Sequence, residues 1–219
     1  MPRAAPTIDT EALIGALPAT LQPLARQGSL HHYRKGALLV EEGGAGDTLY
    51  ILLAGRIRAF SSDLRGREIT YGQYGPGEYI GEMSLDGGPR SASVEALEPS
   101  LCAVVTRQTL MAHIAREPAF AFELLAKVIR RARAATLSAR QMALEDAYGR
   151  LKALLESAAE PQPDGTRLVP GRMTHREIAA RLGCSREMVS RLMKDLVAGG
   201  YLAEQERGIV LSGGLPPRW

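Results

Sequence analysis

Residues 174–197 read THREIAARLGCSREMVSRLMKDLV, the pattern of two short helices joined by a tight turn. Thr174 and Glu177 stand at the spacing of a capping box, which predicts that a helix begins there. Gly183 permits the turn that ends this helix, and Ser185 is a suitable N-cap for the second one. Apolar residues at helical spacing give each helix a face to bury: Ile178, Ala179 and Leu182 in the first, and Val189, Leu192, Met193, Leu196 and Val197 in the second.

The opposite face of the second helix carries side chains of the kinds that read DNA: Arg186, Glu187, Ser190, Arg191 and Lys194. Arginine can pair with O6 and N7 of guanine, glutamate can accept from N4 of cytosine, and lysine and serine can hold phosphates. The alternative is the solvated face of an ordinary helix pair. The short first helix and the Gly-Cys-Ser turn favour a helix-turn-helix. Residues 201–203 and 208–211 are expected to form a small β-wing after it.

The upstream region, residues 30–106, has the sequence pattern of a β domain. Short β-type runs alternate with glycine-containing turns, and the runs are 38–40, 49–52, 57–60, 68–71, 93–96 and 101–105. Many short strands separated by turn signals predict a sandwich or a barrel. Residues 8–27 carry an amphipathic pattern that predicts a short helical lead-in.

After Pro118 the chain is expected to form one long helix as far as Leu155, because no further proline interrupts this stretch and its first glycine is Gly149. Apolar residues recur along it as a heptad-like seam: Leu125, Val128, Ala132, Ala135, Ala139 and Met142. The seam predicts pairing with a second copy of the chain. Packing on the chain's own barrel is the alternative, and the off-seam residues Leu124 and Ile129 suggest that the helix touches both.

Composition narrows the class of protein. The chain has 219 residues and a formal net charge of +3, which permits binding to nucleic acid without requiring it. Its two cysteines, Cys102 and Cys184, are too few for a disulfide framework or an iron–sulfur cluster. The N-terminus lacks the apolar region of a signal peptide, and no apolar run is long enough to span a bilayer. We therefore expect a cytoplasmic protein with no membrane partner and no metal.

Residues 81–92, GEMSLDGGPRSA, are a candidate ligand site. Gly81 lets the backbone turn into a short helix through Met83 and Ser84, whose free N–H groups can face an anion. Arg90 can fork onto a phosphate and Ser91 can donate to it, whereas Glu82 can accept from a sugar hydroxyl. Spacing alone is equally consistent with a hairpin that carries a solvated arginine.

The run GCSREMVSRL at residues 183–192 resembles the recognition-helix signature of the CRP/FNR family of transcription regulators, and the resemblance extends over nearly the whole chain. It implies an α+β fold in three parts. These are an N-terminal β-barrel of the double-stranded β-helix or jelly-roll type (residues 1–116), a long dimerisation helix with its hinge (117–150), and a C-terminal winged helix-turn-helix (151–219).

The same resemblance assigns roles to the polar residues of the helix-turn-helix. Bases are read by Arg186, Glu187 and Arg191, and the DNA backbone is touched by His175, Ser185 and Lys194. Met188 stands where the family often has threonine, so part of the sequence preference is expected to differ. The partners implied are a second copy of the chain, a two-fold symmetric duplex with half-sites close to TGTGA, and RNA polymerase.

Residues 81–91 resemble the phosphate-binding cassette of cyclic-nucleotide-binding domains, with Gly81, Glu82, Arg90 and Ser91 on the positions of the motif. Members that respond to cyclic AMP typically hold its base with a Thr-Ser pair on the long helix. Here the pair falls on Ala135 and Thr136, so one hydroxyl is missing. Cyclic AMP is the first choice of effector. Another cyclic nucleotide or a cyclic dinucleotide is the second, and no effector at all is the third.

Other classes of function fit the sequence less well. A haem sensor would depend on His31, His32 or His113, each of which has an ordinary structural explanation. A cupin-type enzyme would need convergent metal ligands, but the adjacent His31 and His32 would point to opposite faces of a strand. A cyclic-nucleotide-binding module without DNA function would not need the helix at residues 185–194. We therefore predict an allosteric regulator, not an enzyme, with its hinge near residues 143–146.

Overall fold

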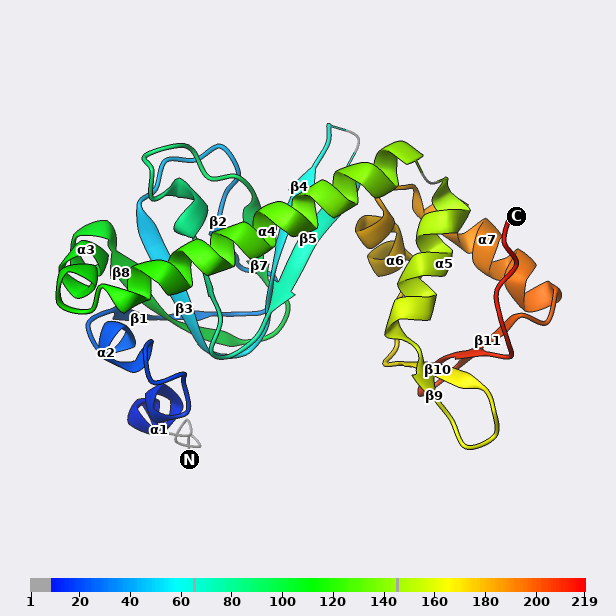
Figure 1. The fold of residues 1–219 in the computed structure, drawn as a ribbon, viewed down its shortest axis with the longest axis horizontal. Helices are drawn as coiled ribbons and strands as arrows, with labels where there is room; N and C mark the ends of the chain where they lie inside the picture. Colours follow the sequence, from blue (N-terminus) through cyan, green and yellow to red (C-terminus); the bar gives the residue numbers. More distant parts are fainter. Residues whose placement is uncertain (1–8, 65, 145) are drawn as a thin grey trace, which may run out of the picture. The chain divides into compact units, whose positions relative to one another are not determined.

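The structure, a computed structural model, describes residues 9–64, 66–144 and 146–219, apart from the side chains of 141–144. The chain divides into two compact units (Figure 1). One comprises Met1–Ser61 with Tyr71–Ala132, and the other comprises Ser62–Thr70 with Arg133–Trp219. Each unit has its own hydrophobic core. The domain boundaries expected after residues 116 and 150 stay predictions.

The first unit is built around two antiparallel sheets. One has the order β1 (Ser29–Tyr33), β8 (Ser100–Thr106), β3 (Thr48–Ala54), β6 (Tyr79–Ile80). The other has the order β2 (Leu38–Val40), β7 (Ser93–Ala96), β4 (Ile57–Ser62), β5 (Glu68–Tyr74), and the end of β4 and the start of β5 fall within Ser62–Thr70 of the other unit. The predicted strand runs all fall on strands, which confirms the mixed α+β fold class. Both sheets keep open edges, so the arrangement is a β-roll and not a closed barrel.

Strand β3 shows how the sequence forms two core layers in this unit. Leu49, Ile51 and Leu53 point to one face, where they join α1 (Thr10–Gly15), α2 (Gln22–Ala25) and α3 (Arg107–Arg116). Leu52 points to the other face and packs with residues of both sheets. The strand is therefore apolar on both faces, as its continuous hydrophobic run requires. The expected helical lead-in is confirmed as two short helices.

The long helix ends earlier than expected. The structure has α4 (Ala119–Leu144) and then a separate α5 (Ala147–Ala158). The Asp146 side chain accepts a hydrogen bond of 2.7 Å from the backbone N–H of Gly149 and so caps α5. The prediction of one helix as far as Leu155 was therefore wrong, because a capping residue within the run starts a new helix. The expected hinge at 143–146 falls partly outside the described residues.

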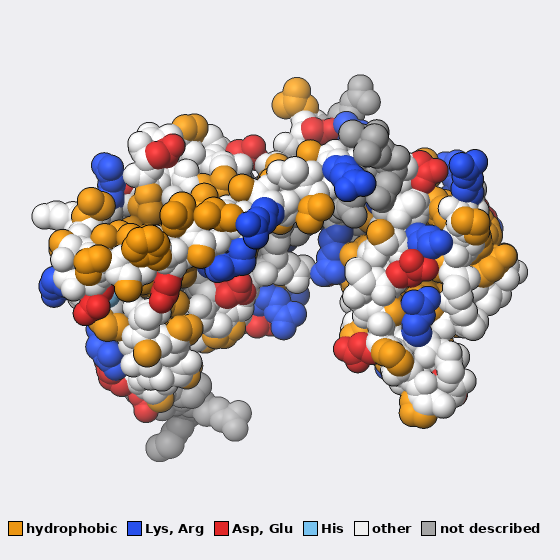
Figure 2. Space-filling view, viewed as in Figure 1, with side chains coloured by type: hydrophobic (Ala, Val, Ile, Leu, Met, Phe, Trp, Pro, Cys, Tyr) orange, Lys and Arg blue, Asp and Glu red, His pale blue; other side chains and the backbone are white. Residues whose placement is uncertain are grey.

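Helix α4 packs on its own unit near its start and exposes apolar side chains further along. Phe120 is buried in the core of the β-roll and Leu124 packs against that core. The seam residues Leu125 and Val128 are instead 53% and 38% exposed. Hydrophobic side chains form a band along this part of the helix in Figure 2. Of the other seam residues, Met142 lies outside the described side chains.

The second unit is a helical core closed by a small sheet. The core contains α5, α6 (His175–Leu182) and α7 (Arg186–Ala198). Four strands follow the order β11 (Leu202–Gln205), β12 (Gly208–Leu211), β10 (Arg167–Pro170), β9 (Glu160–Pro161), so the expected wing is present as the β11–β12 hairpin. Within the described ranges, no helix combines the length and the apolar character needed to cross a membrane.

Candidate functional site

The candidate ligand site begins at a turn that only glycine can make. Gly81 has φ 95°, in the left-handed region, and precedes the 3-10 helix η1 (Glu82–Ser84). A Cβ on Gly81 would lie 2.4 Å from the carbonyl oxygen of Thr48, so a larger residue would push η1 away from β3. The expected short helix after Gly81 is thus present, held against the start of a core strand.

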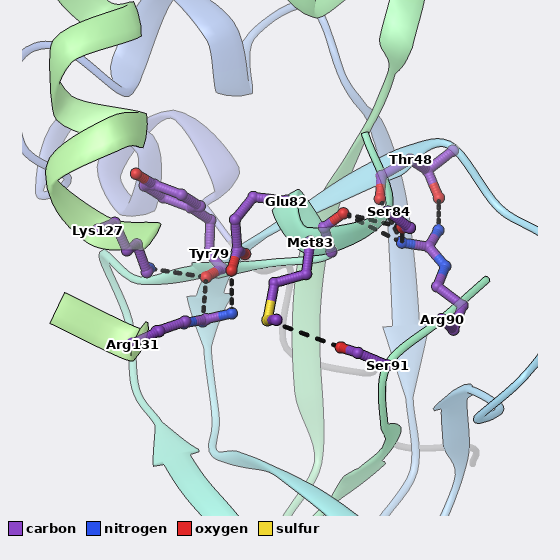
Figure 3. Close-up of polar contacts among 10 residues, drawn as sticks. Thr48, Tyr79, Glu82, Met83, Ser84, Arg90, Ser91, Lys127 and Arg131 are labelled. Carbon is purple, nitrogen blue, oxygen red and sulfur yellow. Dashed lines mark hydrogen bonds and ion pairs between the residues drawn. The ribbon is translucent and has the colours of Figure 1, made fainter. Parts of the chain in front are cut away.

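The buried side chain of Arg90 joins this turn to β3 through hydrogen bonds (Figure 3). The whole residue is only 7% exposed. Nη1 donates to Ser84 Oγ at 2.8 Å, to the Thr48 carbonyl at 3.1 Å and to the Gly81 carbonyl at 3.3 Å, and Nη2 donates to Thr48 Oγ1 at 2.8 Å. A guanidinium has five N–H groups, and these contacts leave Nε–H and one N–H of Nη2 outside them. Arg90 is therefore both a structural anchor and a cation with donors to spare.

Glu82 is a buried carboxylate with one oxygen paired. Its side chain is 1% exposed, and Oε1 forms an ion pair with Nη1 of Arg131 on α4. Its second oxygen, Oε2, is buried and has no hydrogen-bond partner among the described residues. An unpaired buried oxygen costs free energy, so Oε2 marks a place for an additional donor.

A second cation from α4 lies next to Arg131. Lys127 Nζ donates to the Tyr79 carbonyl at 2.7 Å and lies 3.5 Å from the centre of the Tyr79 ring. Burial, with a contribution from the charge of Arg131, lowers the pKa of Lys127 to about 8. Arg131 Nη2 donates to the same carbonyl at 3.3 Å. Both cations therefore hydrogen-bond to the Tyr79 carbonyl, which lies just before the turn at Gly81.

The space between these groups is small. Ser91 Oγ lies 3.7 Å from the sulfur of Met83, and both residues line a cavity of about 40 Å³ together with Arg90 and Arg131. A cavity of this size holds little more than a water molecule. A ligand larger than water would therefore have to displace side chains at the rim, such as half-exposed Met83.

The structure brings together the six predicted ligand residues of the 81–91 segment: Gly81, Glu82, Met83, Ser84, Arg90 and Ser91. It does not test the other two, Ala135 and Thr136, which are exposed on α4 in the second unit. Sequence reasoning missed Thr48, Lys127 and Arg131. Only the arginine pair Arg130-Arg131 gave a signal, and a solvated helix face has the same pattern.

The helix-turn-helix forms as its sequence predicts. Glu177 Oε2 accepts from the backbone N–H of Thr174 at 2.6 Å, and Thr174 Oγ1 accepts from that of Glu177 at 3.2 Å, which completes the capping box. Gly183 ends α6 with φ 64°, and Ser185 caps α7 by accepting from the N–H of Met188 at 3.2 Å. The predicted core residues are buried except Val197, which is 45% exposed because it lies in the last turn of α7.

The predicted DNA-reading residues separate into two groups. Arg186, Glu187, Arg191 and Lys194 are exposed on α7. His175 and Ser190 are half-buried, and Nδ1 of the histidine lies 2.9 Å from Oγ of the serine. The other ring nitrogen of His175 lies 3.1 Å from Oε1 of Glu204 on the wing. Glu204 is a residue that sequence reasoning missed.

Comparisons with protein families agree with both halves of this description. Residues 30–117 match the cyclic nucleotide-binding domain, and residues 149–212 match the Crp-like helix-turn-helix domain. A sensor domain joined to a DNA-binding domain defines the class of protein: a transcription regulator whose binding to DNA is modulated by a ligand.

Individual relatives give the family. The cyclic AMP receptor protein of Thermus thermophilus is 36% identical over 175 residues, which is 78% of this chain and 77% of that protein. The CRP-like cAMP-activated global transcriptional regulator of Mycobacterium tuberculosis is 29% identical over 202 residues, 90% of each chain. The solved structure of the c-di-GMP responsive global regulator CLP of Xanthomonas campestris shares the fold, with a TM-score of 0.76 at 24% identity over 89% of this chain and 98% of that one. The chain belongs to the CRP/FNR family of transcription regulators.

Proposed function

We propose that this chain is a homodimeric, cytoplasmic regulator whose affinity for duplex DNA is set by a cyclic nucleotide, with cyclic AMP as the first candidate. The observation that carries the effector class is the buried, unpaired Oε2 of Glu82. A carboxylate oxygen can only accept, so its missing partner is a donor such as a ribose hydroxyl. The protein acts by binding and not by catalysis.

Two donors near Glu82 fit the phosphate of the same ligand. Among the described residues, the hydrogen bonds of Arg90 leave Nε–H and one N–H of Nη2 unused, and the Ser91 hydroxyl contacts the Met83 sulfur, a weak acceptor. A phosphate would replace that weak contact with charge-assisted hydrogen bonds. The site thus offers an acceptor for a sugar hydroxyl and donors for a phosphate, and a nucleotide carries both of these groups.

Arg131 connects the ligand site to α4, so a bound ligand can change the contacts of this helix. It pairs with Glu82 from the helix, so a ligand that donates to Glu82 changes the partners of a residue on α4. A ligand shifts a conformational equilibrium only as far as it binds one state more tightly than the other. We propose that a rearranged Arg131 supplies this difference and that α4 carries it to the DNA-binding domain.

The exposed apolar side chains of α4 support a dimer through this helix, since Leu125, Val128 and Ile129 would otherwise face water. A dimer places two recognition helices about 34–36 Å apart, one helical turn of DNA. We therefore propose a two-fold symmetric DNA site. RNA polymerase is proposed as a further partner.

A different effector is the second candidate, because Ala135 lacks the hydroxyl that cyclic AMP-responsive members typically offer to the base. The relatives from Thermus thermophilus and Mycobacterium tuberculosis are named for cyclic AMP, whereas the Xanthomonas protein is described as responsive to c-di-GMP. A cyclic dinucleotide is therefore the first alternative. Haem and the absence of any effector are the others.

Calorimetric titration of the purified protein with cyclic AMP, cyclic GMP and c-di-GMP tests the proposal. Each titration is paired with a DNA-binding measurement with and without the ligand. Binding of one nucleotide that also changes DNA affinity supports the function. DNA binding that no nucleotide alters would overturn the effector assignment, and haem addition followed by absorbance spectroscopy would then test the remaining sensor hypothesis.

A further inference from the structure

We infer that Ser190 and Glu204 serve DNA recognition as positioning residues that act through His175, and that Ser190 donates no hydrogen bond to DNA. The inference rests on the proposed DNA-binding function. His175 opens α6, Ser190 lies in the middle of α7, and Glu204 lies on strand β11 of the wing. One imidazole thus joins three elements at the surface proposed to face DNA.

The contact with Glu204 indicates that Nε2 of His175 carries a hydrogen. Glu204 Oε1, 3.1 Å from Nε2, belongs to a carboxylate that can only accept, so Nε2 carries the hydrogen. In a neutral imidazole the other nitrogen is then an acceptor. With the imidazole neutral, Nδ1, 2.9 Å from Ser190 Oγ, accepts a hydrogen bond from the serine hydroxyl.

This assignment changes what Ser190 can do on DNA. A hydroxyl has a single proton, and here it is directed at His175, away from any phosphate. Ser190 keeps its acceptor lone pairs, so it can receive a hydrogen bond from a base amino group but cannot hold a phosphate oxygen. Its main contribution is to tie the recognition helix to the start of α6.

Glu204 has the corresponding role on the wing. The wing segment 204–207 reads Glu-Gln-Glu-Arg, and its first residue is an acid, which can only accept hydrogen bonds and therefore cannot hold a phosphate. The hydrogen bond that Glu204 accepts from Nε2 joins the wing to the start of α6, and the contact of His175 with Ser190 links both to the recognition helix. Both residues should therefore affect how precisely the exposed arginines of α7 meet the bases, and not how many phosphates the protein neutralises.

The test measures the ratio of affinities for a duplex selected from a random pool and for a scrambled duplex, at several salt concentrations. Ser190→Ala and Glu204→Ala are each expected to lower this ratio about two- to tenfold, the usual effect of one hydrogen bond. The double variant should lose little more than either single one, because both act through His175. The salt dependence of DNA affinity should be the same in Ser190→Ala as in the unmodified protein. The loss of a phosphate contact would instead lower the slope of log affinity against log salt concentration by about one.

Two variants separate geometry from charge. Glu204→Gln keeps an acceptor for Nε2 and should restore the ratio lost in Glu204→Ala. Glu206→Ala removes an acid from the same wing away from His175, and it should leave the ratio high. Thermal melting of every variant shows that the fold is retained, and nitrogen NMR of the imidazole in the free protein should report a proton on Nε2.

Three results would overturn the inference while leaving DNA binding intact: a proton on Nδ1 of the unbound protein, additive losses in the double variant, or a lower salt slope in Ser190→Ala. Failure of the unmodified protein to select any sequence, with or without nucleotide, is a different result. It would overturn the proposed function itself, and with it the role of these residues.

Discussion

Arg90 illustrates how one residue can serve both fold and ligand. It is buried among neutral oxygens of Thr48, Gly81 and Ser84, so its charge is balanced by hydrogen bonds and by no carboxylate in direct contact among the described residues. A cation held in this way attracts an anion strongly once water is excluded. The spacing of the 81–91 segment predicted the phosphate role but could not reveal the anchoring one.

We expect Arg90→Ala to weaken nucleotide binding by well over tenfold, since each hydrogen bond to a charged group is worth about 1.5–3 kcal/mol. The structure adds that the melting temperature should also fall, because the contacts of Ser84 and Thr48 are lost with the guanidinium. Calorimetry and thermal melting measure the two effects. Thr48→Val is the matched control, because it removes an anchor of Arg90 without removing the cation. Unchanged nucleotide affinity in Arg90→Ala would be incompatible with the site.

His113 predicts a pH dependence of stability. It is 3% exposed and packs edge-on against Phe120, with ring centres 5.1 Å apart. Burial, with the charge of Arg116 adding to it, lowers the pKa of His113 below its ordinary value of 6.5. The folded state thus binds the proton less readily than the unfolded chain does. The stabilisation from a neutral His113 is fully present above pH 6.5 and is lost as the pH falls from there towards the lower folded pKa.

Denaturant unfolding at pH 7.5 and pH 5.5 measures this effect. The unmodified protein should lose more free energy of unfolding on acidification than His113→Gln, which cannot titrate. His31→Gln is the matched control, because it makes the same substitution at an exposed histidine. Equal losses in the unmodified protein and His113→Gln would show that this histidine does not contribute.

At the scale of elements, local signals in the sequence were sufficient to predict the helix-turn-helix. The capping box, Gly183 and Ser185 predicted both ends of the helix-turn-helix, because capping depends on residues close in sequence. Residues that join distant segments were not predictable in this way. Arg131 meets Glu82 across 49 positions of sequence, and nothing local distinguishes it from the neighbouring arginine.

The break between α4 and α5 had a local signal that the helical pattern obscured. Asp146 is a good N-cap, but apolar residues continue at helical spacing on both sides of it. Leu151 and Leu155 continue the pattern because they pack in the core of the second unit, whereas Phe120 packs in the first. Periodicity alone does not show that the two halves of a run face different cores.

The exposed part of α4 carries the dimer prediction. Val128→Glu together with Ala135→Glu should yield monomers, because two charges per helix would be buried without partners in the seam. Sedimentation velocity measures the association state. Arg133→Glu is the control, since it adds a negative charge beside the seam at an exposed position and should leave the dimer intact. Variants that sediment as dimers would show that another surface mediates association.

At the scale of the whole molecule, the proposed regulation requires an element that connects the ligand pocket to the DNA-binding domain and changes position when the ligand binds. Arg131 is the candidate link, since it reaches from α4 to Glu82. We expect Arg131→Gln to reduce the ratio of DNA affinities measured with and without nucleotide, while the fold stays intact. Exposed Arg130→Gln is the matched control on the next position. An undiminished ratio in Arg131→Gln would place the coupling elsewhere.

The recognition helix supports the last prediction. Arg186 follows the Ser185 cap, so its exposed side chain leaves the first turn of α7, the end that a helix-turn-helix directs into the major groove. Arg186→Ala should cost about 1–3 kcal/mol on the preferred duplex and relax the preference mainly at one G·C pair. Lys194→Ala should instead weaken binding to all sequences evenly and lower the salt slope by about one, because a phosphate contact carries no sequence information.

Selection from a random-oligonucleotide pool distinguishes these two outcomes, with the unmodified protein expected to recover a two-fold symmetric site whose half-sites contain a guanine. A loss of sequence preference can be separated from a loss of overall affinity only if Arg186 and Lys194 contact different parts of the duplex. Each variant therefore serves as the control for the other. Asymmetric sites, or an Arg186→Ala variant that selects the same sequence with equal stringency, would mean that α7 does not enter the groove by its first turn. The exposed residues further along the helix, Arg191 foremost, would then be the ones left to read the bases.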